Sequence, residues 1–385
     1  MQARYFLIFI LILSFVCICG CVSAPQETQT EIQTQTPAAQ MTEDLDNLSV
    51  TVPVLIDEKF GYTLDITNEE FLRYGFTPGD SVDLAFSNGY LEADVPCVSG
   101  SLVSAGTVFA VSDAAESKPK IRDSMHMQNA FNLFEGDTVT VSLHTKQKYA
   151  ALEKISQLQY EDTPAEGMAP ETFANFRALP SGVLKKDLLF RGASSVDDRR
   201  GRAGTVNTLL EKYGINAVLN LANTEEDVIQ ILDENGDALN YAKELHNIDR
   251  LISVLMTPLY MTEEFQNNIA GALKRLIQLP GPYYIHCLEG KDRAGFTCLL
   301  IEAVCGVPLD DIKADYMQTY ANYYGVTKES APEMYEAALS EKFRPMIAFI
   351  TKDNTLSLAD GARAYLREGG MSDEEIDGMI DLFTV

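Results

Sequence analysis

The stretch that most constrains the fold is residues 283–295, where an apolar run ends at Cys287 and an apolar helical pattern begins after Arg293. This order predicts a strand, a tight loop and a helix. Such a loop can wrap an anion, because a helix N-terminus offers unpaired N–H groups and a partial positive charge. Gly290 lets the backbone turn tightly, and successive amides can form an anion-binding nest.

The side chains of this loop add a nucleophile and a fixed charge. Five residues separate Cys287 from Arg293, whose planar guanidinium can hold two phosphate oxygens. The same positive surroundings favour a thiolate, since they bring a cysteine pKa to roughly 3.5–7.5. A thiolate beneath a bound phosphate would form a phospho-cysteine. Because arginine and backbone dipoles stabilise the charge, we expect neither a metal ion nor another cofactor.

The full string HCxxGKDRxG at residues 286–295 resembles the signature loop of the protein tyrosine phosphatases. It is most similar to bacterial tyrosine and dual-specificity phosphatases, some of which also accept phosphoinositides. A rhodanese loop usually has a cysteine-to-arginine spacing one residue shorter. The resemblance implies that Cys287 attacks phosphorus and that the whole loop binds the phosphoryl group. The phosphate-binding residues are then Cys287, Leu288, Glu289, Gly290, Lys291, Asp292 and Arg293.

The leaving oxygen needs a proton, which a carboxylic acid can supply. Asp292 lies inside the loop, and the resemblance favours it. Asp249 precedes Cys287 by 38 residues, roughly where other tyrosine phosphatases place an acid on a mobile loop. His286 is expected to orient the loop and support the thiolate, or to be neutral and structural.

Two positions depart from the family pattern. Many members have serine or threonine directly after the arginine, where the hydroxyl helps the thiolate leave, but this chain has Ala294. The subgroup often has Asp-Leu-Arg at the end of an earlier strand, where this chain has Asn220, Leu221 and Ala222. Efficient hydrolysis of the intermediate and any role of that arginine are therefore not carried over.

The composition limits the partners. The chain has 385 residues, enough for two or three domains, and a net charge of −26 with a pI near 4.5. This charge argues against binding nucleic acid or an anionic membrane through the surface. Outside the N-terminal leader the cysteines show neither metal-ligand spacing nor a disulfide framework; they are Cys97, Cys287, Cys298 and Cys305.

The N-terminus reads as a targeting segment. Residues 5–19 are almost wholly apolar, which is short for a membrane span and fits a secretory signal. The sequence before Cys21 resembles a bacterial lipobox, which implies a signal peptide over residues 1–20 and a lipid on Cys21. Residues 21–47 are polar and proline-containing and predict a flexible tether. The protein is then extracytoplasmic and held to the cell membrane of a bacterial-type envelope by its lipid. A simple cleaved signal or an uncleaved anchor is the alternative.

The remaining chain divides by pattern. Residues 48–149 predict a small β-rich accessory domain, either a sandwich or an open barrel. Apolar runs separated by turn signals predict its strands at residues 48–54, 62–66, 82–86, 90–98, 107–111 and 138–143, with a short helix at 68–74. His126 and His144 are isolated there and receive no role. Residues 150–169 are read as a linker.

Residues 170–385 predict an α/β catalytic domain with a central, mostly parallel sheet flanked by helices. Residues 215–221 predict a buried strand and residues 241–248 another. Helices are predicted at residues 204–212, 224–235, 265–279, 296–304, 309–316, 357–368 and 372–383. Asp310 is the expected cap of the helix at 309–316. The nucleophile then lies at the carboxyl end of a strand, where such sheets bind ligands.

The wall of the pocket and the substrate stay open at this point. Aromatic side chains that could line the pocket are Tyr320, Tyr323, Tyr324 and Phe343. The first hypothesis is a tyrosine or dual-specificity phosphatase acting on phosphoproteins or small phosphate esters. The alternatives are an inositol-phosphate or phosphoinositide phosphatase and a non-catalytic phosphate-binding lipoprotein.

Overall fold

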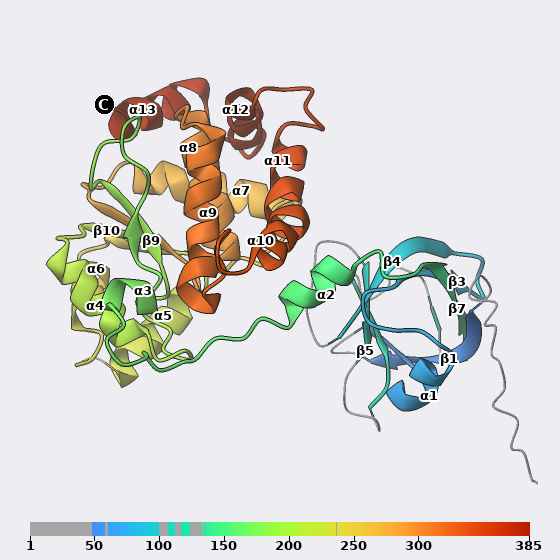
Figure 1. Ribbon diagram of the computed structural model, residues 1–385. Helices are drawn as coiled ribbons and strands as arrows, with labels where there is room; N and C mark the ends of the chain where they lie inside the picture. Colours follow the sequence, from blue (N-terminus) through green and yellow to red (C-terminus); the bar gives the residue numbers. More distant parts are fainter. Residues whose placement is uncertain are drawn as a thin grey trace, which may run out of the picture. The chain divides into compact units, whose positions relative to one another are not determined.

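The computed structural model describes residues 48–57, 61–99, 107–111, 117–123, 133–134, 136–235 and 237–385 (Figure 1). The predicted signal peptide, tether and lipidation site at Cys21 lie outside these residues, as does His126. Among the helices of the described residues, none has the length and apolar character needed to cross a membrane.

The first region is a closed barrel with the strand order β1-β2-β6-β5-β4-β3-β7. Its pairs are antiparallel except for β4 with β5, and β7 pairs with β1 to close it. The expectation of a sandwich or an open barrel is therefore wrong, because the pairing returns to the first strand. Its strands are β1 Ser49–Asp57, β2 Gly61–Leu64, β3 Ser81–Phe86, β4 Leu91–Ser99, β5 Thr107–Val111, β6 Lys120–Asp123 and β7 Thr138–Thr145.

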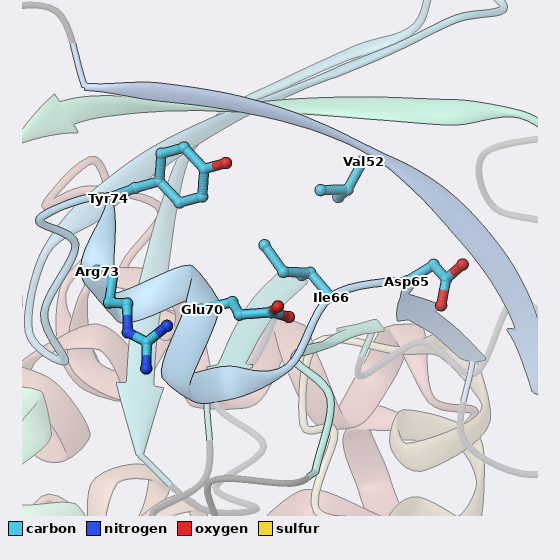
Figure 2. A pocket seen from close by; sticks show the side chains of 6 residues that line it. All are labelled: Val52, Asp65, Ile66, Glu70, Arg73 and Tyr74. Atoms are coloured by element: carbon cyan, nitrogen blue, oxygen red, sulfur yellow. The ribbon is translucent and has the colours of Figure 1, made fainter.

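Helix α1, Asn68–Arg73, packs onto the barrel as predicted and is capped by Thr67, which forms a capping box with Glu70. Its Phe71 stacks on Phe76 with ring centroids 4.6 Å apart. A pocket of about 550 Å³ lies beside α1 and β1 (Figure 2). Its lining contains no predicted site residue; it consists of Val52, Asp65, Ile66, Glu70, Arg73 and Tyr74.

After the last barrel strand in the sequence, helix α2, Ala150–Ser156, occupies the start of the predicted linker. Residues 157–169 contain turns and irregular backbone without helix or strand. This irregular part contacts the second sheet's loops, as described below.

The predicted α/β architecture is confirmed for the second region. Its sheet has the order β11-β10-β12-β9-β8, with β8 antiparallel at one edge and the other strands parallel. The strands are β8 Arg177–Ala178, β9 Leu189–Gly192, β10 Ala217–Asn220, β11 Leu251–Ser253 and β12 Tyr283–His286.

One predicted strand is wrong. Residues 241–248 fall mostly in α6, Asn240–Asn247, and the strand follows as β11. The buried residues of α6 are Ala242 and Leu245, three positions apart, which is the spacing of a helix that turns one face to the core. Short apolar runs do not separate these two possibilities by pattern alone.

The register brings the carboxyl ends of the parallel strands to one level. His286 pairs with Asn220 on one side and Gly192 on the other, and Asn220 pairs with Ser253. Residues just beyond these positions therefore meet along one edge of the sheet. Cys287 is the first residue past β12 and lies at this edge.

Both faces of the sheet are covered. Neighbouring residues of each strand point to opposite sides, and each side packs into its own apolar cluster. Leu219 and Ile285 belong to one apolar cluster, whereas Val218 and Tyr284 belong to another. The first cluster includes α8, which is buried around its circumference between residues 294 and 304 and contacts α9 (Figure 1). The helices are α3 Pro170–Phe173, α4 Ala203–Lys212, α5 Glu225–Glu234, α6, α7 Glu263–Leu276, α8 Asp292–Val304, α9 Leu309–Tyr324, α10 Pro332–Ala338, the π-helical η2 Leu339–Phe343, α11 Arg344–Ile350, α12 Leu358–Glu368 and α13 Asp373–Phe383.

The cap predicted for α13 is present, whereas the cap predicted for α9 is not. Ser372 and Glu375 form the expected capping box at α13. Asp310 does not cap α9, which begins after Pro308; its carboxylate pairs with Lys313 in the first turn instead. Proline at this position has no N–H to lose, and the acidic residues after it still favour the positive end of the helix.

Candidate active site

The strand, loop and helix predicted around Cys287 are present. Strand β12 ends at His286, and α8 begins at Asp292. Gly290 has a φ of +68°, and a Cβ atom there would lie 2.1 Å from the carbonyl oxygen of Gly192. Glycine is therefore required both by the backbone conformation and by the close approach of β9. Cys287 carries a free thiol and is 3% exposed.

Arg293 is held at the same edge by backbone oxygens. Its Nη1 donates to the carbonyl of Leu221 at 3.0 Å and to that of Met256 at 3.1 Å, both beyond the ends of neighbouring strands. Within the described residues, its Nε and Nη2 have no hydrogen-bond partner. A guanidinium has five N–H donors, so this arrangement fixes its plane and leaves donors for a phosphate.

His286 is a neutral side chain in this site. Its Nδ1 lies 3.1 Å from the carbonyl oxygen of Cys287, and its Nε2 lies 3.0 Å from the Ser195 hydroxyl. A carbonyl only accepts, so Nδ1 donates and Nε2 accepts from Ser195. Burial lowers the pKa of His286 to about 4, which keeps the ring uncharged at neutral pH. It therefore orients the loop backbone and adds no charge to the thiolate.

Arg191, for which the sequence predicted no role, lies beneath the loop. It is 1% exposed, and its Nη2 donates to the carbonyls of Gly290 at 2.8 Å and Lys291 at 3.2 Å. In a trans peptide the N–H points opposite to the C=O. Holding these two carbonyls downward therefore turns the amides of Lys291 and Asp292 the other way, toward a bound anion.

The charge of Arg191 is balanced by Asp315 of α9. Its Nη1 is 2.5 Å from Oδ2 of Asp315, whose Oδ1 is 2.6 Å from Nε of Arg177. Burial would raise the pKa of Asp315, but the charges of Arg177 and Arg191 outweigh it and hold the pKa below its usual value. Nearby Glu302 has its pKa raised well above the usual range by burial. Two guanidinium groups thus face one carboxylate, and a net positive charge remains beneath the loop.

The outer side of the loop is held at Glu289. Its carbonyl accepts from Tyr323 Oη at 2.7 Å and from Asn175 Nδ2 at 3.2 Å. Its carboxylate accepts from Tyr160 Oη at 2.5 Å. Asn175 itself has a positive φ of +52°, a conformation that asparagine tolerates better than most residues. Leu288 is tied to the neighbouring loop through its carbonyl, which accepts from the amide of Ser194.

The two acid candidates lie at opposite ends of the parallel strands. Asp292 is the first residue of α8, and its side chain is 46% exposed beside Lys291. Asp249 is in the turn before β11, with a φ of +57°. Strand β11 runs from Leu251 to Ser253, about 7 Å, and Asp249 lies before its amino end, whereas Cys287 follows the carboxyl end of β12. The structure therefore places Asp249 away from Cys287, and Asp292 next to Arg293 at the start of α8.

The expected aromatic wall is only partly at the site. Tyr320 and Phe343 are buried in the core. Tyr323 contacts the loop through Glu289, and the hydroxyl of Tyr324 lies 3.3 Å from Nζ of Lys291. Over the residues that the structure describes, no group of three or more His, Cys, Asp or Glu side chains is placed to hold a metal ion.

A signal for the missed residues existed in the sequence. Asp315 falls between Ile312 and Tyr316, on the face of α9 that the apolar pattern turns toward the core. An acidic residue on a core face needs a buried partner. The sequence could have indicated this need, but it does not identify Arg191 as the partner because the two lie 124 positions apart.

Comparison with known proteins gives a family for the second region. The model of the tyrosine phosphatase family matches residues 171–385. The triple specificity protein phosphatase PtpB of Mycobacterium tuberculosis is 26% identical over 147 residues, covering 31% of this chain and 53% of the relative, so the match spans about half of the relative's length. The core catalytic domain of the PP-IP phosphatase SIW14 from S. cerevisiae is 17% identical, covering 46% of this chain and 96% of that one, with a TM-score of 0.25, which is too low to support an argument.

Replacing Asp315 tests the support beneath the loop. Asp315→Asn leaves two buried guanidinium groups without a counter-charge, and we expect the free energy of unfolding at pH 7 to fall by roughly 3–5 kcal/mol. Because the pKa of Asp315 is lowered, its contribution is present above its unfolded pKa of about 3.9 and is lost as the pH falls through the folded value. Urea unfolding measures the loss. Asp310→Asn, on the exposed side of the same helix, is the control; equal effects of the two changes would contradict the prediction.

Proposed function

The chain belongs to the tyrosine phosphatase family, and from that premise we propose that it hydrolyses phosphate monoesters through a phospho-cysteine intermediate. One observation carries the proposal. The Cys287 thiol lies at the end of β12 beneath a loop whose amides are turned outward by Arg191, while Arg293 keeps donors free at the same edge. This is a site for one tetrahedral anion with a nucleophile below it.

In the first step the thiolate of Cys287 attacks phosphorus. The S–P bond forms as the P–O bond to the leaving group breaks, and Asp292 donates its proton to the leaving oxygen. Arg293 and the amides of the loop hold the phosphoryl oxygens and stabilise their charge during transfer. The net positive charge around Arg191 adds to that stabilisation from beneath.

In the second step water attacks the phospho-cysteine. The new P–O bond forms, the S–P bond breaks, and the proton of the water passes to the carboxylate of Asp292. Ala294 supplies no hydroxyl to the departing thiolate. The positive charge beneath the loop and the first turn of α8 are the groups that stabilise the thiolate here.

The nucleophile is tested first. We expect Cys287→Ser to lower kcat/KM on a small aryl phosphate by roughly a thousandfold or more, because a hydroxyl is a much weaker nucleophile than a thiolate. Phosphate release from the aryl phosphate, a phosphotyrosine peptide and an inositol phosphate measures the activity. Cys305→Ala, outside the loop, is the control. If the unmodified protein turns over none of these compounds, or if the serine variant keeps its activity, the proposal is wrong.

The acid is tested with leaving groups of different basicity. We expect Asp292→Asn to lower kcat/KM about a hundredfold on an alkyl phosphate, whose leaving oxygen needs a proton, and far less on a nitrophenyl phosphate. Asp249→Asn serves as the matched control and should change neither rate. A uniform loss on both substrates after Asp292→Asn would remove its role as the acid.

We further propose that the chain is attached to a membrane by a lipid on Cys21. The lipobox-like sequence supports this, and Cys21 lies outside the described residues. In a bacterial host the protein with the natural Cys21 should then fractionate with membranes, lack residues 1–20 and carry the mass of the lipid. Cys21→Ser should abolish both the mass and the cleavage after Gly20. Unchanged fractionation and mass in the variant would contradict lipid attachment.

A further inference from the structure

The basic side chains beside the loop are paired with carboxylates. Nζ of Lys291 lies 3.2 Å from Oε2 of Glu289, and Nη2 of Arg200 lies 3.8 Å from Oε1 of the same residue. Arg199 pairs with Asp197 at 2.5 Å. Arg293 differs, because its hydrogen-bond partners are carbonyl oxygens. Lys291 and Arg200 are thus both paired with one carboxylate of the loop, that of Glu289.

Glu289 and Asp292 are the carboxylates of the loop, and Tyr160 fixes the position of Glu289. The Tyr160 hydroxyl donates to Oε1 at 2.5 Å. The Tyr160 ring stacks on Tyr323 with centroids 4.6 Å apart and planes 21° apart. Tyr323 in turn donates to the Glu289 carbonyl at 2.7 Å. One stacked pair of tyrosines therefore holds both the backbone and the side chain of Glu289.

Residues 160–162, here called the strap, lie before the part of the chain that the family model matches. Arg202 holds them by three contacts. Its Nη2 donates to the Glu161 carbonyl at 2.8 Å, and its guanidinium lies 4.8 Å from the centroid of the Tyr160 ring. Asp162 also pairs with Arg202 at 3.1 Å. The strap is thus a fixed part of the loop's surroundings.

Glu289 is charged in this setting. Burial would raise its pKa, but the positive charge of Lys291 and the hydrogen bond from Tyr160 outweigh burial, so the pKa lies below the usual value. The carboxylate is therefore ionised at neutral pH. Tyr160 is a neutral donor, since burial raises the pKa of its hydroxyl.

We propose that Glu289, held in place by Tyr160, is a specificity-determining residue that weakens binding of substrates with further phosphate groups beside the one that is transferred. Lys291 is paired with Glu289 and also lies 4.0 Å from Asp292, so Arg293 and the amides are left to bind a single phosphate. A second phosphate near the rim meets the carboxylate of Glu289 and arginines that already have partners. The inference rests on the proposed function in taking phosphate as the ligand, but it concerns binding and not turnover.

The test compares an anion with one phosphate and an anion with several. Calorimetric titration of the full chain, in a Cys287→Ser background that blocks turnover, gives the Kd values of inorganic phosphate and inositol hexakisphosphate. We expect Glu289→Gln to lower the ratio of the Kd of inositol hexakisphosphate to that of phosphate by about five- to tenfold. This corresponds to a charge–charge energy between the values expected in water and near a protein surface. Higher ionic strength should reduce the difference.

Tyr160→Phe keeps the stacked ring and removes only the hydroxyl. If the hydroxyl acts by positioning Glu289, the ratio should fall by a smaller amount, about two- to threefold, and the double variant should fall no further than Glu289→Gln alone. A purely structural role for Tyr160 would instead give additive effects or none. If Glu289→Gln does not fold, the effect of Tyr160→Phe on the ratio still tests whether a positioned Glu289 weakens binding of the anion with several phosphates.

Matched controls separate local from general effects. Tyr241→Phe removes a hydroxyl that donates to the Ile215 carbonyl at 2.9 Å, at the amino edge of the sheet. Glu368→Gln removes a carboxylate paired with Lys352 at 3.1 Å and changes the net charge equally. Neither should alter the ratio. An unchanged ratio in Glu289→Gln, or an equal change in Glu368→Gln, would overturn the inference. Because titration needs no turnover, an inactive enzyme would refute the proposed function and leave this result standing.

Discussion

The hydrogen bonds from Arg191 to the carbonyls of Gly290 and Lys291 are the interaction on which the site depends. A loop with free N–H groups on its upper side must satisfy its carbonyls below, where water has no access. The guanidinium of Arg191 holds two adjacent carbonyls from within the core. Burying that guanidinium is costly, and Asp315 offsets the cost by pairing with it. The ion pair therefore fixes a backbone conformation more than it adds to stability.

The sheet register supplies the second constraint. Gly192, His286 and Asn220 lie side by side, so the segments that follow them meet at one edge. Gly290 can approach the Gly192 carbonyl only without a side chain, and this contact presses the loop against β9. Arg293 receives its carbonyl partners from the segments after β10 and β11. Each neighbouring strand thus contributes one contact that shapes the loop around Cys287.

The parts of the site that could be predicted are those written in local sequence. The strand before Cys287, the loop and α8 follow from an apolar run, a glycine and a helical pattern, and the structure contains them. The strand expected at residues 241–248 was wrong because a short apolar pattern fits both structures. Asp249 has a suitable spacing from Cys287. A strand at residues 241–248 would have put it at a carboxyl end, but the strand follows it as β11, so it lies at an amino end. Arg191 and Tyr160 act through contacts with residues distant in sequence, which no local pattern specifies.

The positive charge of this site comes from beneath the loop more than from its rim. Below, Arg177 and Arg191 share the one carboxylate of Asp315, and burial raises the pKa of nearby Glu302. Above, Lys291 is paired with Glu289. A buried charge acts on an anion that enters the loop and is screened less by salt than an exposed one. This distribution favours the phosphoryl group seated over Cys287 and gives little attraction to other anionic groups of the same molecule.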